Sequence, residues 1–432
     1  MADFRPADSE VVQEQGLPER FVVHEMIVDK LLIEADDVAI EIYPDQRLSR
    51  RELLSRASNS CLQLKSLGIE PGSFVVTCVQ SYPLSVIVHL SIIMAGAVII
   101  PCDLSQPGEV NSQMPEEVEH VLYENCQERV VERLIQNSNE RRMFVNVCRF
   151  RYEESNRDAL DCRAAIETTI TASHLCWAYP TSGSTSGTSR YVLAEHQSVA
   201  NYIINHPVLV EEAKGGRQKR ILLWSPFVFD PYAGDVLAAL YHGAVLCLWD
   251  GKQEDHRIEA NEWRSNFLLG CAGALQATRA THLCTTPSIL NYIAYELQAT
   301  EPRELEAKLP DLSVVGVGGE MTSGSMVNLW ASSFVLLNLY GCTECCVYQS
   351  AHRMRSIHDR CIVGDPLPRV ALDIVDRSGQ PCPDGAFGRI RIAGVQVGRG
   401  YLSGKQDEWA GGELPDHAVF AMTLTGERCF IT

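Results

Sequence analysis

The chain has 432 residues, of which 46% are hydrophobic and 21% charged, values typical of a globular protein with a large buried core. Its formal net charge is −18, from 55 acidic and 37 basic residues. Because such a chain repels phosphate backbones and anionic lipid, the composition argues against nucleic acid and membrane partners. An anionic substrate must therefore be held by a local binding site, because the overall electrostatic field of the chain would repel it.

The N-terminal segment and the cysteines indicate a cytoplasmic protein. Residues 1–20 are polar and acidic, which predicts a flexible tail and no secretory leader. The 16 cysteines are scattered, and we interpret them as reduced thiols, mostly small buried hydrophobes. Cys342 and Cys345 fit the C-x-x-C pattern of a redox pair or half a zinc site, but no second such pattern accompanies them.

The first regular elements are a helix and a strand. Ser49 is typical of a helix N-cap, an apolar face follows with Leu53, Leu54 and Ala57, and Gly68 predicts the end of the helix. Residues 74–79 are rich in β-branched side chains and predict a strand. The nearly uncharged run 84–100 is about as long as the shortest membrane-spanning helices. Polar residues interrupt it and a Gly divides it, so we expect a buried helix and a core strand instead.

The rest of the chain predicts an α/β fold. Strand patterns at 221–224, 244–249, 281–285 and 312–317 alternate with helical ones, which indicates layered parallel β-sheets with flanking helices. The charge-rich stretch 109–156 predicts a surface helix and loops. From about residue 357, short β-rich pieces and turns predict a small β-barrel-like subdomain. We therefore expect an α/β core over 21–355 and a β-rich subdomain over 356–432.

The most specific local feature is the stretch 179–192, YPTSGSTSGTSRYV. Residues 181–189 are all Ser, Thr or Gly, and Arg190 follows. Small residues let backbone N–H groups approach a phosphate, hydroxyls add hydrogen bonds, and the guanidinium neutralises charge. The glycine spacing and the lysine of the G-x-x-x-x-G-K-[ST] loop are missing. By itself the stretch is also compatible with a flexible linker.

Several motifs together resemble the acyl-adenylate-forming superfamily, which includes acyl-CoA synthetases, luciferases and the adenylation domains of nonribosomal peptide synthetases. The superfamily's phosphate loop, T-S-G-S-T-G-x-P-K-G-V followed by His, matches 181–185, Gly187, Val192 and His196. Further matches occur in the family's order at 48–53, 94–103, 229–230, 318–320, 338–344, 398–402 and 425–427. The resemblance covers roughly residues 45–430 and is closest to the adenylation domains.

The resemblance implies ATP-dependent activation of a carboxylate, an amino acid before other acids, as acyl-AMP with release of pyrophosphate. The implied cofactors are ATP and Mg²⁺. Arg190, Thr343 and Glu344 would be catalytic, with Glu344 as the metal ligand. The residues implied to bind ATP are Thr181, Ser182, Gly183, Ser184, Thr185, Gly187, Gly318, Gly319, Glu320, Asn338, Tyr340, Gly341 and Glu427.

The resemblance also implies a substrate pocket. Asp230 would pair with the α-ammonium group of an amino acid, since a buried carboxylate is costly without a cation. The other implied pocket residues are Phe229, Pro231, Gly234, Cys284, Gly316, Gly318, Leu339, Val347 and Tyr348. Because three of these are glycine, we expect a roomy pocket.

The chain departs from the family pattern at several positions. Arg190 replaces a lysine, Ser186 lengthens the loop, Cys342 replaces a proline and Glu427 replaces an aspartate. The family's mobile C-terminal subdomain, which carries a further lysine, is expected to be absent. A separate C-terminal subdomain or a carrier protein would then be the partner. Two other functions stay open: an acyl-CoA synthetase-like acid–thiol ligase fragment, and a degenerate protein that binds ATP without turnover.

Overall fold

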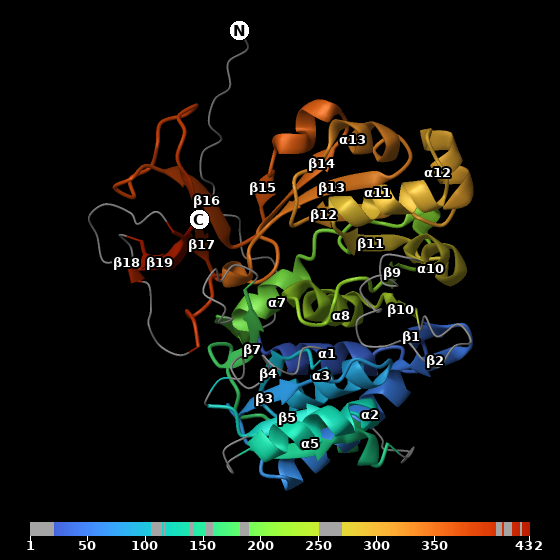
Figure 1. Cartoon of the computed structure of the whole chain (residues 1–432), viewed down its shortest axis with the longest axis vertical. Helices are drawn as coiled ribbons and strands as arrows, with labels where there is room; N and C mark the ends of the chain where they lie inside the picture. Colours follow the sequence, from blue (N-terminus) through green and yellow to red (C-terminus); the bar gives the residue numbers. More distant parts are fainter. Residues whose placement is uncertain are drawn as a thin grey trace.

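The computed structural model describes residues 21–104, 115, 117–137, 142–152, 159–181, 190–249, 270–402, 408–409, 417–423 and 426–432. Three sheets organise these residues (Figure 1). The two larger sheets are stacked with helices between them, and the third lies to one side. Of the sequence features named above, residues 1–20 and 182–189, parts of the stretch 109–156 (109–114, 116, 138–141 and 153–156) and Thr425 lie outside the described part.

The first large sheet has nine strands in the order β15-β14-β13-β12-β11-β9-β10-β1-β2. From β13 through β1, neighbouring strands are parallel, whereas β2, β14 and β15 pair in the antiparallel sense. The strands are β1 (Val38–Tyr43), β2 (Gln46–Ser49), β9 (Arg220–Leu222), β10 (Val245–Trp249), β11 (His282–Thr285), β12 (Val314–Gly318), β13 (Val335–Tyr340), β14 (Ser350–Met354) and β15 (Asp365–Pro366).

The second large sheet has six strands in the order β6-β5-β3-β4-β7-β8, parallel except for the β7–β8 pair. The strands are β3 (Phe74–Thr77), β4 (Val98–Pro101), β5 (His120–Tyr123), β6 (Met143–Asn146), β7 (Leu175–Pro180) and β8 (Tyr191–Glu195). β5 and β6 correct the expectation of only helix and loops over 109–156. Each strand has only four residues and lies near charged residues, so the sequence shows no clear alternation of apolar and polar side chains there.

The third sheet has five strands in the order β16-β17-β20-β19-β18. They are β16 (Val370–Val375), β17 (Arg389–Gly394), β18 (Glu408–Trp409), β19 (Val419–Met422) and β20 (Arg428–Ile431). Glu195 on β8 ties this sheet to the six-stranded one. Its carboxylate accepts from Arg399 Nε at 3.0 Å and from Arg428 Nη2 at 2.7 Å.

Helices cover both faces of the nine-stranded sheet. The strands alternate between two cores: Ile221 packs into the core between the large sheets, and Leu222 into the core beneath α10, α11 and α13. The helices are α1 (Val23–Leu32), α2 (Arg50–Ser66), α3 (Leu84–Met94), α5 (Glu128–Asn137), α6 (Ala159–Ala164), α7 (His196–Ile204), α8 (Asp230–His242), α10 (Cys271–Thr278), α11 (Pro287–Glu296), α12 (Pro302–Lys308) and α13 (Gly324–Trp330). Together these layers confirm the predicted α/β class.

Local sequence signals explain individual elements. Ser49 and Glu52 form a reciprocal capping box at the start of α2, as the N-cap prediction requires. The apolar run 84–100 becomes buried helix α3 and buried strand β4. In the described part of the chain, no helix is both long and apolar enough to cross a membrane. The cysteines, including Cys342 and Cys345, are free thiols.

Candidate active site

The candidate site lies where the parallel strands of the nine-stranded sheet end. Asp230 opens helix α8 after β9, Gly318 ends β12, and Tyr340 ends β13. The chain then turns through a short 3-10 helix, Thr343–Cys345, before β14 returns. Because parallel strands present their carboxyl ends at one edge, segments far apart in sequence meet there, as ligand sites in α/β sheets require.

Asp230 is the buried acidic group of this site. Its side chain is 6% exposed, and its carboxylate accepts from the Val347 N–H at 3.0 Å and from the Thr343 hydroxyl at 3.4 Å. Burial raises the pKa of Asp230 to about 7; the Val347 hydrogen bond partly offsets this rise, and the nearby charge of Glu344 adds to it. The carboxylate is thus poised to lose its proton when a cation arrives.

The loop that meets Asp230 has strained backbone. Cys346 and Val347 have φ values of +66° and +70°, a region that residues with a side chain rarely adopt and that is least favourable for a β-branched one. Two buried glutamines fix this loop through hydrogen bonds to its backbone. Gln349 accepts from the Cys342 N–H at 2.9 Å and donates to the Cys345 carbonyl at 2.8 Å. Gln396 donates to the Cys346 and Tyr348 carbonyls, each at 3.0 Å.

Glu344 and Arg190 come together through Tyr401. The Tyr401 hydroxyl donates to Glu344 Oε1 at 2.8 Å, and the Arg190 guanidinium lies 4.4 Å from the centre of the Tyr401 ring. Burial, together with the Glu344 charge, raises the pKa of the Tyr401 hydroxyl, so it stays a donor. Across the sheet, Thr181 N–H donates to the Arg190 carbonyl at 2.9 Å. A carboxylate and a guanidinium therefore flank the same ring.

Glycines in the site leave little room for side chains. A Cβ on Gly341 would lie 2.1 Å from the Val347 carbonyl oxygen, so only glycine lets the loop fold back there. The three glycines from which we expected a roomy pocket do not face open space. A Cβ on Gly234 would meet Tyr202 at 2.7 Å, one on Gly316 would meet Val208 at 2.5 Å, and one on Gly318 would meet Tyr348 at 2.5 Å. Neighbouring side chains fill the space that these glycines leave.

Some residues implied to bind ATP have other partners. Glu320 accepts hydrogen bonds from the Ser288 N–H and hydroxyl at the start of α11. Asn338 donates to the Ile362 carbonyl at 2.7 Å. Glu427 is exposed, and its N–H donates to Thr423 Oγ1 at 3.0 Å. Tyr340 is half-buried, and Phe229, which was implied to line the substrate pocket, is 44% exposed. Ser182, Gly183, Ser184, Thr185 and Gly187 lie outside the described residues.

Comparison with known proteins decides the family. The model of the AMP-binding enzyme family matches residues 33–402. The chain belongs to the AMP-binding enzyme family. This AMP-binding chain is 27% identical over 388 residues to the nonribosomal peptide synthetase ecdA of Aspergillus rugulosus, and 26% identical over 396 residues to malpibaldin synthetase of Mortierella alpina. The matches cover 88% and 90% of the chain but span only 5% and 7% of those two proteins.

Solved structures share the fold of the AMP-binding chain. One is the N-terminal subdomain of Klebsiella oxytoca NpsA in complex with 3-hydroxybenzoyl-AMSN, with a TM-score of 0.70 and 19% identity. The match covers 95% of this chain and 93% of that one. Another is the nonribosomal peptide synthetase FmoA3, with a TM-score of 0.73 and 18% identity over 95% of this chain and 40% of that one. These matches confirm the predicted architecture.

Sequence patterns missed a buried polar group of this AMP-binding chain. His206, Asp235 and Cys284 are fully buried, and their ligand atoms lie within 4.8 Å of one another, the one such group among the described residues. His206 Nδ1 accepts from the Leu209 N–H at 3.2 Å, so the proton of the neutral ring lies on Nε2, which faces Asp235 Oδ1 at 2.9 Å. Nε2 therefore has no lone pair for a metal ion, and the group is a hydrogen-bonded pair beside a thiol.

Proposed function

We propose that this chain activates the carboxylate of an amino acid. A carboxylate oxygen would attack the α-phosphorus of ATP, the bond to the bridging oxygen would break, and pyrophosphate would leave with the electron pair. The observation that carries this proposal is the contact of buried Asp230 with Thr343, the residue before Glu344. It supports a site whose amine-binding end adjoins its phosphate-binding end, so that both reactants are held in one orientation.

Asp230 would hold the substrate through its ammonium group. Its carboxylate is buried and accepts hydrogen bonds from the Val347 N–H and the Thr343 hydroxyl. A cationic donor would stabilise the charged form, which burial disfavours. An acid without an amine would leave Asp230 without that cation, which favours an amino acid over a simple fatty or aryl acid.

Thr343, Glu344 and Arg190 would serve the phosphates. Glu344 is a half-buried carboxylate, the kind of oxygen ligand that Mg²⁺ takes alongside substrate phosphates, so the residue fits this ion. Bound Mg²⁺ would neutralise charge between the two anions. Arg190 would add a fixed positive charge at the end of the Ser/Thr/Gly stretch. Thr181, at its start, has a buried hydroxyl without a partner in the described residues, which supports a donor role toward phosphate.

We also propose that the activated acyl group passes to the thiol of a carrier protein. The support is the similarity to peptide synthetases and to an NpsA–ThdA protein described as an artificially fused adenylation–PCP di-domain. An acyl-AMP is a mixed anhydride, so a thiolate could displace AMP without further activation. Coenzyme A is the alternative acceptor. Adding a carrier protein or coenzyme A to the preformed acyl-AMP, and measuring which of them receives the acyl group, distinguishes the two.

The test is exchange of labelled pyrophosphate into ATP by the full chain, with pooled amino acids and pooled fatty or aryl acids. We expect exchange with one amino-acid pool, lost in Glu344→Gln and Asp230→Asn. The matched control is Asp45→Asn, which removes an exposed carboxylate and should change nothing. Exchange driven by amine-free acids would contradict the amino-acid assignment. ATP binding without exchange from any pool would contradict activation itself.

A further inference from the structure

A cavity lies at the opposite edge of the nine-stranded sheet from the candidate active site. It has a volume of about 290 Å³. Arg217, Thr281 and Asp311, which line it, come just before β9, β11 and β12. The candidate active site follows the other ends of these strands. A ligand here would therefore be separate from the substrates of the proposed reaction.

The cavity is strongly cationic in an otherwise acidic protein. Its lining includes four arginines and two carboxylates, so these groups carry a net charge of +2, whereas the whole chain carries −18. The four arginines are Arg47, Arg217, Arg220 and Arg279. Gathering like charges costs free energy unless anions compensate them. The two carboxylates, Glu41 and Asp311, compensate half of that charge.

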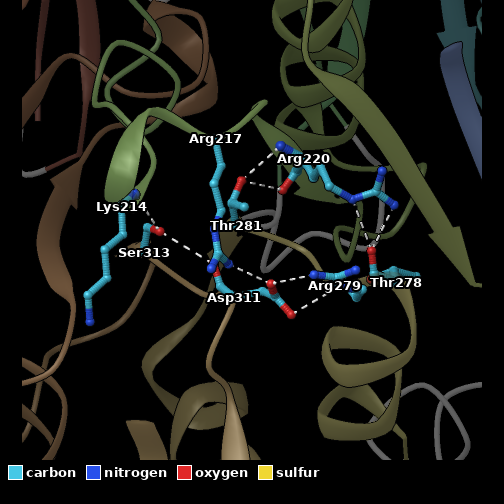
Figure 2. A network of polar contacts seen from close by, with 8 residues as sticks. All are labelled: Lys214, Arg217, Arg220, Thr278, Arg279, Thr281, Asp311 and Ser313. Carbon is cyan, nitrogen blue, oxygen red and sulfur yellow. Dashed lines mark hydrogen bonds and ion pairs between the residues drawn. The ribbon is translucent and has the colours of Figure 1, made fainter.

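The carboxylates hold the guanidinium groups in place (Figure 2). Asp311 accepts from Arg217 at 2.7 Å and from Arg279 at 3.3 Å. Figure 2 shows these two side chains approaching Asp311 from opposite sides. Both remain accessible, with side chains 55% and 73% exposed. Each guanidinium is planar and carries five donors, so one carboxylate contact does not use up its capacity.

Arg220 forms the inner wall. Its Nε and Nη2 donate to the Thr278 carbonyl at the end of α10 at 3.1 and 2.8 Å, and Nη2 lies 3.1 Å from Glu41. Its backbone is tied to Thr281, whose hydroxyl accepts from the Arg220 N–H at 2.8 Å. The Arg220 side chain is 21% exposed. The wall is thus fixed by the sheet, and the two accessible arginines stand at the rim.

From this arrangement we propose that the cavity binds a small phosphorylated anion, through Arg217 and Arg279. A phosphate dianion matches the excess charge of +2, and its oxygens fit the fork of a guanidinium. Because carboxylates already hold these arginine side chains in place, less side-chain entropy is lost when an anion binds. The concave shape and small volume favour a phosphate carried by a small molecule over one on a folded partner.

The test uses arginine modification of the full chain by phenylglyoxal, with each modified peptide quantified by mass spectrometry. At inorganic phosphate ten times its Kd, we expect Arg217 and Arg279 to react about tenfold more slowly, because the rate follows the unliganded fraction. Sodium chloride at equal ionic strength controls for screening. Arg149, an exposed arginine paired with Glu128, is the internal control. Equal rates with and without phosphate would overturn the proposal.

Calorimetric titration of variants gives a second readout. The double variant Arg217→Gln/Arg279→Gln should bind phosphate at least about tenfold more weakly, and Arg149→Gln should bind as the unmodified chain does. Thermal unfolding without phosphate checks that the double variant is folded. Phosphate that bound at the active site instead would be unaffected by these changes, so unchanged affinity in the double variant would overturn the proposal. A phosphoserine peptide that protects the same arginines at far lower concentration would also overturn the small-molecule assignment.

Discussion

The Tyr401 hydroxyl donates to Oε1 of Glu344 over 2.8 Å, and the same ring lies beneath the Arg190 guanidinium. Tyr401 lies in the segment between β17 and β18 of the five-stranded sheet and forms an isolated antiparallel bridge with Val192 on β8. A single tyrosine thus orients a proposed metal ligand and packs against a proposed phosphate ligand.

Replacing Tyr401 by Phe should reduce the rate of pyrophosphate exchange by about 10- to 150-fold, the equivalent of one lost hydrogen bond to a charged group. The ring would still support Arg190, because the cation–π contact does not need the hydroxyl. The check is exchange as a function of Mg²⁺ concentration, where the variant should require more Mg²⁺. Tyr401→Phe with an unchanged Mg²⁺ requirement would argue that the hydroxyl does not orient Glu344.

Asp230 predicts a pH-dependent rate. Only the ionised carboxylate can pair with an ammonium group, and its pKa in the folded protein is about 7. Amino-acid-dependent kcat/KM should therefore rise with pH through about 7. Asp230→Asn should lose most of the activity at every pH. A flat profile between pH 6 and 8 would contradict an ammonium-binding role.

The same pKa predicts the pH dependence of stability. The folded pKa lies above the ordinary value of 3.8, so the folded state keeps a proton that the unfolded chain releases. The free energy of unfolding should therefore fall as pH rises from about 4 to 7, by up to about 1.4 kcal/mol per pH unit from this group. Urea titrations of the unmodified chain and Asp230→Asn check this. The slope difference between them should vanish above pH 7.

Gly316→Ala should destabilise the fold by about 1–3 kcal/mol, because the new Cβ would lie 2.5 Å from Val208. Val208→Ala should relieve part of that cost, so the double variant should be more stable than the sum of the single effects predicts. Gly273→Ala in α10 is the matched control. Nothing lies within 4 Å of its Cβ position, so alanine there should stabilise the helix by about 0.5–1 kcal/mol.

Gln396→Leu should destabilise the fold by about 1–3 kcal/mol and lower exchange activity. It would leave the buried carbonyls of Cys346 and Tyr348 without the donor they now share. The expected activity change is a rise in KM for the amino acid, because Val347 in the same loop contacts Asp230. If KM were unchanged and only stability fell, Gln396 would have no positioning role.

Sequence alone could predict the α/β layers because their signals are local. Ser49 caps α2 and apolar runs form buried strands wherever the pattern is long enough. β5 and β6 escaped detection because four residues among charged neighbours carry no clear period. β5 takes its place in the sheet by pairing with β3, and β6 by pairing with β5, and both pairings are tertiary contacts.

The packing around the candidate site could not be predicted from the sequence, and the roles assigned to its residues stay predictions. The motifs named Asp230 and Glu344, yet no sequence pattern indicates that Tyr202 on α7 fills the space beside Gly234 on α8. Gln349 and Gln396 were also missed, because a buried glutamine has no pattern until the carbonyls that it satisfies are known. Such contacts join segments that only the fold brings together.

The left-handed backbone at Cys346 and Val347 sets a limit on engineering this protein. Glycine at either position would relieve strain on the order of 1–3 kcal/mol, so a selection for heat resistance would favour it early. The same change would loosen the segment that presents the Val347 N–H to Asp230. Thermal robustness and substrate discrimination therefore compete at two adjacent residues, and variants improved in one should be screened for loss of the other.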